Sequence, residues 1–272
     1  MNKFSLEHQL FVKKYKKEKR IIYFFQIMII AIFLIIWEIL GNCHIINTFL
    51  FSSPSKIINN LCSLLQNGSL FLHIGVTSLE VFLSFTISTI ISIVMSFLLW
   101  RFPLFSKIID PYITILNSLP KVALGPLIII WVGASVHSVI FMAVTITVFS
   151  SIINIYSVFS SVPSNYISLF KSFHASKWKT FYKLILPYSF QTIIATLKVN
   201  ISMSLIGVIM GELLVSKNGI GYLIMYGSQI FNLDLVISNI FVLAIISSVM
   251  YYLLDLLLQI GCKAKKNQRF MM

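Results

Sequence analysis

Long apolar runs separated by short polar segments set the pattern of this chain. Five of the runs reach the ~20 residues that a helix needs to cross a bilayer. They cover residues 21–40, 74–100, 139–159, 188–215 and 235–260. We expect each of them to form a membrane-spanning helix.

A sixth apolar segment, residues 105–133, is interrupted by Pro111, Pro120 and Pro126. Its uninterrupted parts are too short to span a bilayer alone. We therefore expect it to cross only as a kinked helix that begins near Asp110. Such breaks are tolerated at membrane depth where neighbouring helices satisfy the freed backbone groups.

A polar segment, Ser168–Pro187, lies between the spans expected at 139–159 and 188–215. Its lysines are Lys171, Lys177, Lys179 and Lys183, and its apolar residues, at roughly helical spacing, are Phe170, Phe173, Trp178, Phe181 and Leu184. This pattern predicts an amphipathic helix that Pro187 ends, within a loop covering 160–187. A helix of this kind docks a soluble partner or lies on the membrane surface.

Composition agrees with the membrane assignment. Of the 272 residues, 58% are hydrophobic and 11% charged, and the mean hydropathy is +0.92. Soluble domains carry about 25% charged residues, so we expect an all-α polytopic membrane protein with about six spanning helices. Around the first span, 21–40, the other regions are a basic tail (1–20), a loop with a short interfacial helix (41–73), a five-helix core (74–260) and a second basic tail (261–272).

The net charge of +13 is concentrated on one side of the expected spans. Seventeen of the 21 Lys and Arg residues fall in segments on the same side as both termini, whereas two, Lys56 and Lys217, fall on the other side. Basic segments stay in the cytoplasm, so we expect both termini and Ser168–Pro187 there. The basic tails are expected to rest against anionic lipid of the bilayer, and no nucleic acid is expected as a partner.

Polar side chains within the spans are candidates for a transport pathway, because buried charge is costly in lipid. We select Glu80 in the second span, and Asn200 and Glu212 in the fifth. Serines and threonines such as Ser92 and Ser96 also recur within spans. For these, helix packing and pore lining are both open interpretations.

Motifs of enzymatic chemistry are absent from the sequence. It contains no Walker A motif, no GxSxG and no HExxH, and its five histidines are scattered. Cys43, Cys62 and Cys262 have no metal-ligand spacing, and a disulfide between Cys43 and Cys62 is left open. We expect no cofactor, no metal site and no catalysis on this chain.

Three stretches resemble the membrane permease subunits of bacterial ABC importers of the binding-protein-dependent type. They are His174–Pro187 (HASKWKTFYKLILP), Leu119–Gly133 (LPKVALGPLIIIWVG) and Gly207–Ile224 (GVIMGELLVSKNGIGYLI). Within that family, the chain looks most like the branch that includes nitrate, sulfonate, taurine and thiamine-precursor permeases. The resemblance covers roughly residues 51–260.

The resemblance implies a type I importer permease in the bacterial inner membrane, present as a homodimer. A cytoplasmic ABC ATPase subunit would receive the segment between the fourth and fifth spans and would carry out ATP hydrolysis. An extracytoplasmic binding protein would deliver a small solute, such as a sulfonate- or nitrate-type anion or a vitamin precursor. The expected ATPase-docking residues are Phe173, His174, Ala175, Lys177, Trp178, Phe181 and Pro187.

The docking segment departs from the family pattern at four positions, Ser168, Leu169, Phe170 and His174. The family has Glu-Ala-Ala at the first three and, at the last, a glycine that forms a turn between two short helices. His174 is therefore expected in a left-handed or extended conformation, at a cost of about 1 kcal/mol. Histidine tolerates the left-handed region better than most residues.

The alternative function is a stand-alone secondary transporter or channel. It predicts inverted repeats and charge pairs at the membrane midplane. The two halves of the sequence have no convincing repeat, and Lys198 is the lysine expected deep in a span. We expect Lys198 and Glu212, ~14 residues or ~21 Å apart along one helix, not to pair.

Overall fold

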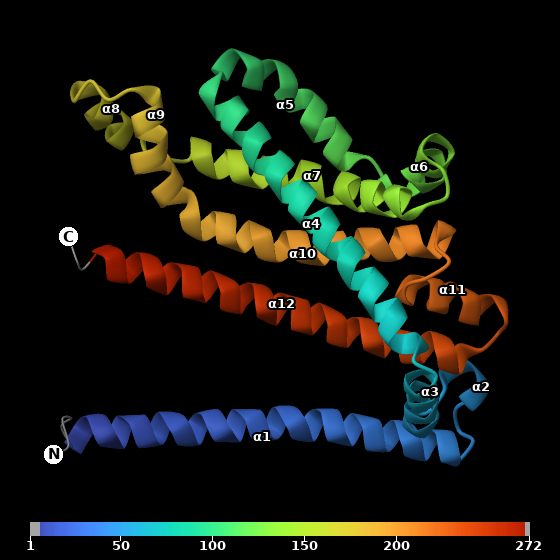
Figure 1. Cartoon of the computed structure of the whole chain (residues 1–272). Coiled ribbons are helices and arrows are strands. Elements are labelled where there is room, and N and C mark those ends of the chain that lie inside the picture. Colours follow the sequence, from blue (N-terminus) through green and yellow to red (C-terminus); the bar gives the residue numbers. More distant parts are fainter. Residues whose placement is uncertain (1–5, 270–272) are drawn as a thin grey trace.

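The computed structural model describes residues 6–269, and every regular element in that range is helical (Figure 1). The long helices are α1 (Leu6–Asn42), α4 (Ser69–Arg101), α7 (Val136–Ser160), α10 (Leu186–Val215) and α12 (Leu233–Arg269). The shorter ones are α2 (Thr48–Phe51), α3 (Pro54–Gln66), α5 (Pro103–Ser118), α6 (Gly125–Val132), α8 (Ser164–Ser172), α9 (Lys177–Thr180) and α11 (Ile220–Gln229). A 3₁₀ turn, η1 (Lys121–Leu124), precedes α6, and a π-helical turn, η2 (Phe181–Ile185), precedes α10.

The long helices form a bundle with two distinct ends (Figure 1). Helix α7 packs along both α10 and α4, while α12 packs against α11, α3 and α10. Figure 1 shows α8, α9 and the ends of the described chain at one end of the bundle, and α3, α6 and α11 at the other. Because the helices between these ends are apolar, the two ends correspond to the two faces of a membrane.

Five helices are long and apolar enough to span a membrane, and a bent pair raises that number to six. The bent pair is Pro103–Ser118 with Lys121–Val132, at an angle of 86°. The kink expected from the prolines is therefore present, in a helix pair with the form of a broken span or a re-entrant loop, and the pair begins at Pro103 rather than near Asp110. Pro120 makes the break, because it holds Leu119 in an extended conformation (ψ 142°).

The first and last spanning helices extend beyond their apolar runs. Helix α1 begins at Leu6, within the basic tail of residues 1–20, and α12 continues to Arg269. Lysine and arginine are good helix formers, so a helix does not need to stop where the apolar run stops. The short helix expected in the 41–73 loop is α3, which Ser53 caps at its N-terminus. Cys43 and Cys62 are free thiols, and the side chain of Cys262 lies outside the described part of the structure.

Several serines within the spanning helices lie at contacts between α4, α7 and α10. For these residues the structure favours a role in helix packing over a role in lining a pore. Ser92 and Ser96 of α4 are fully buried and donate hydrogen bonds to the carbonyls of Val148 (3.2 Å) and Ile152 (3.1 Å) of α7. On the other side of α7, Gly207 of α10 lies against the backbone of Ala143. Small and hydroxylated residues allow this close approach between spanning helices.

The expectation of one amphipathic helix over Ser168–Pro187 is wrong. The chain forms α8, then a turn, then α9, which continues through η2 into α10. Pro187 does not end a helix, because it lies in the first turn of α10 directly after the π-helical turn. A π turn shifts the hydrogen-bond register, which lets a helix pass a residue without a backbone N–H.

Candidate functional site

The turn between α8 and α9 depends on His174. Its φ is +51°, which is the left-handed one of the two conformations, left-handed or extended, that the sequence analysis expects. The turn is closed by hydrogen bonds from the His174 N–H to the Lys171 carbonyl (2.9 Å) and from the Ala175 N–H to the Phe170 carbonyl (3.0 Å). These two bonds satisfy carbonyls at the C-terminus of α8, as in other helices that end in a left-handed residue.

The second half of the turn starts α9. The side chain of Ser176 accepts a hydrogen bond from the Lys179 N–H at 3.3 Å and so caps the short helix. Residues 173–178, which we call the coupling turn, project at the end of the bundle that holds α8 and α9 (Figure 1). Phe173 is 76% exposed and Trp178 61% exposed. Such large apolar surfaces in a polar turn mark a contact surface.

The expected docking residues fall into an exposed group and an anchoring group. His174 and Lys177 are exposed like Phe173 and Trp178, and Ala175 is half-buried. Phe181, in contrast, is buried, with its ring centroid 4.7 Å from that of Phe97, 5.2 Å from that of Trp100 and 5.4 Å from that of Phe159. Pro187 is half-buried in the first turn of α10. Phe181 therefore holds the turn against the bundle, while Pro187 keeps part of its surface exposed.

The three pathway candidates all lie inside the bundle. Asn200 of α10 is buried, and its amide donates to Ser151 of α7 (2.9 Å) and to Thr89 of α4 (3.5 Å). Asn200 thus joins three spans. Glu80 and Glu212 are each 1% exposed, and their side chains interact with each other.

Glu212 closes a hydrogen-bonded cluster at the opposite end of the bundle from the coupling turn. Its carboxylate accepts from Thr77 of α4 at 2.6 Å and from the backbone N–H of Gly221 at 2.5 Å. Two further N–H groups at the start of α11 donate to α4, Gly219 to His73 (2.9 Å) and Ile220 to Thr77 (2.9 Å). We call His73, Thr77 and Glu212 the α11 clip, because they bind three consecutive N–H groups of α11.

Glu80 differs from Glu212 in its partners. Both carboxyl oxygens of Glu80 are buried, and within the described residues its carboxyl lies against that of Glu212 rather than against backbone N–H groups. The sequence analysis selected Glu80 and Glu212 but missed His73 and Thr77. Their spacing contained the signal, since His73, Thr77 and Glu80 are four and three residues apart and so share one face of α4.

The expected deep lysine, Lys198, forms an ion pair with Asp255 of α12. The pair neutralises the two charges where α10 and α12 pack together. Lys198 also lies 5.3 Å from the ring centroid of Tyr251.

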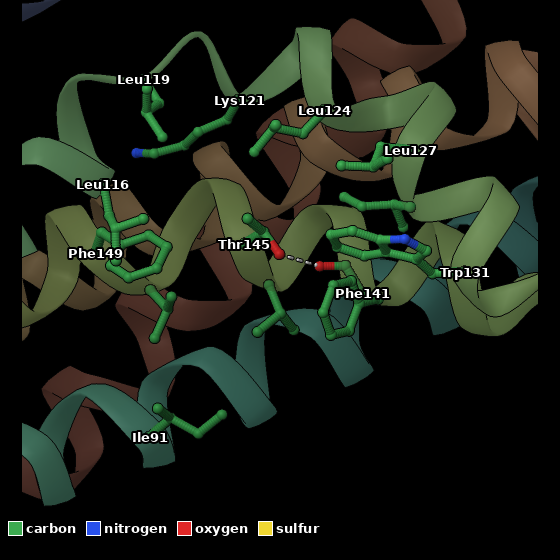
Figure 2. Close-up of a pocket in the computed structure, with 13 residues that line it drawn as sticks. Ile91, Leu116, Leu119, Lys121, Leu124, Leu127, Trp131, Phe141, Thr145 and Phe149 are labelled. Atoms are coloured by element: carbon green, nitrogen blue, oxygen red, sulfur yellow. Dashed lines mark hydrogen bonds between the residues drawn. The ribbon is translucent and has the colours of Figure 1, made fainter.

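A second lysine in a segment expected at or within a span is Lys121. Lys121 lies in η1, at the break of the bent span, and lines a pocket of about 380 Å³ between the bent span, α7 and α4 (Figure 2). The other lining residues are apolar except Thr145, and they include Phe141, Phe149 and Trp131. Thr145 donates to the Phe141 carbonyl at 2.8 Å, so its hydroxyl is already satisfied. Lys121 lines the pocket mainly with its apolar stem, and its ammonium donates to the side-chain oxygen of Asn117 (2.9 Å) and to the Ile146 carbonyl (3.3 Å).

A comparison with family models matches residues 88–260 to "Binding-protein-dependent transport system inner membrane component". The chain is 26% identical over 232 residues to a "Probable ABC transporter permease protein" of Haemophilus influenzae, covering 85% of this chain and 94% of that protein. It is 26% identical over 189 residues to the formylaminopyrimidine transport permease protein ThiX of Halalkalibacterium halodurans, covering 70% and 75%. It is 21% identical over 245 residues to the taurine transport system permease protein TauC of Escherichia coli, covering 88% and 86%.

The fold is also similar to a solved structure. A chain of the MetNI methionine ABC transporter, in an inward facing conformation, superposes with a TM-score of 0.62 at 14% identity. The match covers 71% of this chain and 96% of that chain. The helical bundle of this chain therefore has the same fold as that chain.

Proposed function

Because the chain belongs to the family of binding-protein-dependent transport system inner membrane components, we propose that it couples to a cytoplasmic ATPase through its coupling turn. The chain is a multi-pass permease subunit of an ABC importer for a small solute. The permease forms the translocation pathway, and ATP hydrolysis takes place on the separate ATPase subunit. The exposed coupling turn, residues 173–178, is the observation that carries the proposal.

The exposed side chains of the coupling turn suit insertion into a groove. Phe173 and Trp178 supply large apolar area, and Lys177 adds a charge beside them. Short helices with such anchors dock into grooves of their partners. Behind them, the buried ring of Phe181 ties the turn to Phe97 of α4 and Phe159 of α7. A movement of the ATPase surface is thereby transmitted to two spanning helices.

Charge supports an orientation with the coupling turn and both termini in the cytoplasm. The basic residues of the N-terminal tail precede the first span, and those of the coupling region lie at the same end of the bundle (Figure 1). Basic segments are retained on the cytoplasmic side. The opposite end, with α3 and α11, then faces the extracytoplasmic binding protein.

We also propose that two copies of the chain form the complete pathway. Helix α1 supports this, because only 6% of the residues in its apolar, membrane-spanning stretch are buried by the rest of the described chain. A spanning helix that touches so little of its own bundle has surface available for a second copy and for lipid. ThiX is named as a formylaminopyrimidine permease and TauC as a taurine permease. We therefore propose a pyrimidine-type vitamin precursor or an amino sulfonate as the class of solute.

Co-purification tests the ATPase coupling. The tagged full-length chain is extracted from membranes of its own host in mild detergent, and associated proteins are identified by mass spectrometry. We expect an ATPase subunit with the wild type and with Ile58→Glu, which changes an exposed residue on α3 at the opposite end. Ala175→Glu is expected to lose the ATPase while remaining in the membrane. Absence of any ATPase from the wild-type sample would contradict the proposal and favour a stand-alone transporter.

A further inference from the structure

Two carboxyl groups meet inside the bundle, at the end opposite the coupling turn. Glu80 of α4 and Glu212 of α10 are each 1% exposed, and their carboxyl groups lie against each other. We propose that this pair binds a single proton, which Glu80 carries and shares with Glu212, and that loss of the proton releases the start of α11. The proposal goes beyond transport and ATPase coupling, because it assigns a pH-sensitive site to the permease chain itself.

No cationic side chain of the described residues neutralises this pair. Lys198, the lysine within α10, is paired with Asp255 instead. His73 is uncharged in this arrangement, because its Nδ1 accepts the Gly219 N–H at 2.9 Å. Two buried carboxylates in contact repel each other, whereas a proton on one of them removes the repulsion and adds a hydrogen bond.

The hydrogen-bond partners of the two residues decide which of them carries the proton. Glu212 accepts from Thr77 and from the backbone N–H of Gly221, and donors of this kind stabilise an ionised carboxylate. Both oxygens of Glu80 are buried, and no backbone N–H, hydroxyl or amide of the described residues donates to them. A carboxylate oxygen has two lone pairs, so Glu212 can also accept the O–H of a protonated Glu80. The proton therefore belongs on Glu80.

A proton fits the pair better than a metal ion does. A metal ion needs several ligands around it. The neighbouring polar side chains, His73 and Thr77, already accept the N–H groups of Gly219 and Ile220 at the start of α11. A proton needs only one donor and one acceptor, which the two carboxyl groups supply.

The proton on Glu80 affects α11 through Glu212. The Glu212 carboxylate accepts the Gly221 N–H, and it lies so close to Gly219 that a Cβ there would collide with it. When Glu80 loses its proton, the new negative charge repels that carboxylate. We expect this repulsion to break the hydrogen bonds that Glu212 accepts from Thr77 and Gly221, and so to open the α11 clip.

The pH range between about 7.5 and 9 separates this site from other titrating groups. Unperturbed carboxyl and imidazole groups titrate below this range, and phenol and ammonium groups titrate above it. The other titratable side chains of the elements at this end of the bundle are Lys56, His73, His137, Lys217, Tyr222, Tyr226 and Asp234. A change within the range therefore reports on the pair.

Infrared spectroscopy of the full-length chain tests where the proton is. In dodecyl maltoside, a detergent without a carbonyl group, the C=O stretch of a protonated carboxyl is separate from the bands of carboxylates and peptide groups. At about pH 7.5 exposed carboxyl groups are ionised, so we expect this band, with the intensity of one carboxyl per chain, in the wild type. Glu80→Gln should remove it. Asp234→Asn should keep it, although Asp234 also has a buried oxygen without a hydrogen-bond partner among the described residues.

The thermal unfolding midpoint tests the effect of the proton on the fold. The folded chain would hold a proton that the unfolded chain has released, so raising the pH from about 7.5 to about 9 should lower the midpoint of the wild type. Glu80→Gln keeps a hydrogen-bond donor but has no proton to lose, and its midpoint should fall less. The midpoint of Asp234→Asn should fall as far as that of the wild type.

Three outcomes overturn the proposal. They are absence of the protonated-carboxyl band from the wild type, persistence of the band in Glu80→Gln, and equal falls of the midpoint in the wild type and Glu80→Gln. The first outcome concerns the wild type alone and needs no variant to fold. Because no ATPase takes part, failure here leaves ATPase coupling untouched, and failure of co-purification leaves the protonation result untouched.

Discussion

The carboxylate of Glu212, on α10, accepts a hydrogen bond of 2.5 Å from the backbone N–H of Gly221 in the first turn of α11. The same carboxylate accepts from Thr77 of α4, which in turn accepts from the N–H of Ile220. One buried side chain therefore joins α10, α4 and the short helix α11 at the end of the bundle opposite the coupling turn. The α11 clip thus holds α11 against the bundle by its N-terminal N–H groups.

Glu212→Gln and Glu80→Gln are expected to differ sharply, although both change a buried carboxyl group. The carboxylate of Glu212 accepts hydrogen bonds from two donors. In a glutamine at this position the amide nitrogen, which cannot accept, would face one of them, and leaving a buried donor unsatisfied costs about 1–3 kcal/mol. An amide at position 80 keeps the side-chain shape and can donate a hydrogen bond to the neighbouring carboxyl of Glu212. Thermal unfolding in detergent should show a clear fall in midpoint for Glu212→Gln and little change for Glu80→Gln. Equal falls would refute the separate roles of the two residues.

Gly219 and Gly221 are expected to be intolerant of a side chain for different reasons. A Cβ at Gly219, whose φ is +111°, would collide with the carboxyl of Glu212, and a Cβ at Gly221 would lie 2.7 Å from the Cβ of Glu212. Gly133 has a φ of +85° but open space around its Cβ position. Alanine should therefore lower the unfolding midpoint most at 219, where strain and collision combine, and least at 133, where strain acts alone. A reversed order would show that the clip does not constrain this loop.

His174→Gly is expected to stabilise the chain by about 1 kcal/mol, because glycine adopts a φ of +51° without the steric cost that a Cβ adds. Lys171→Gly is the matched control, since Lys171 is exposed and lies within α8. Glycine inside a helix costs about 1 kcal/mol, so this variant should be less stable than the wild type. The midpoints of the two variants in detergent should move in opposite directions. A fall with His174→Gly would mean that the imidazole stabilises the turn by more than its strain costs.

Phe173→Ala and Phe181→Ala should separate docking from folding. Phe173 is 76% exposed, so its removal leaves the bundle intact and is expected to weaken ATPase association. Phe181 is 7% exposed and packs on four rings, those of Phe97, Trp100, Phe159 and Trp178, and truncating a buried Phe costs about 3–5 kcal/mol. The unfolding midpoint should fall for Phe181→Ala and not for Phe173→Ala. The same fall for both would place Phe173 inside the fold and remove it from the docking surface.

Periodicity and local chemistry explain why much of the fold could be predicted. Apolar runs locate the five uninterrupted spans, and Pro120 locates the break in the sixth. The family resemblance predicts a turn at position 174 with a left-handed or extended residue, and the structure has the left-handed conformation there. These features depend on a few neighbouring residues, so the sequence alone carries them.

The missed features depend on contacts between distant parts of the chain. Phe181 lies three residues after Trp178, on the same face of a helix, and the sequence therefore predicts both at the docking surface. In the structure the rings of Phe97 and Phe159 bury Phe181. The α11 clip joins residues 146 positions apart, His73 and Gly219. The bend at Pro120 brings Lys121 against α7, where it donates to the Ile146 carbonyl, and the sequence does not specify this contact. Helical periodicity does not specify which face meets which partner.

Photo-crosslinking tests the coupling of this permease to an ATPase most directly. The photoreactive residue p-benzoylphenylalanine replaces either Trp178, in the coupling turn, or Ile58, which is 59% exposed on α3 at the other end of the bundle. After illumination of host membranes, crosslinked partners are identified by mass spectrometry. We expect an ATPase subunit crosslinked from position 178 and not from position 58. An ATPase crosslinked from position 58, or none from position 178, would contradict the account.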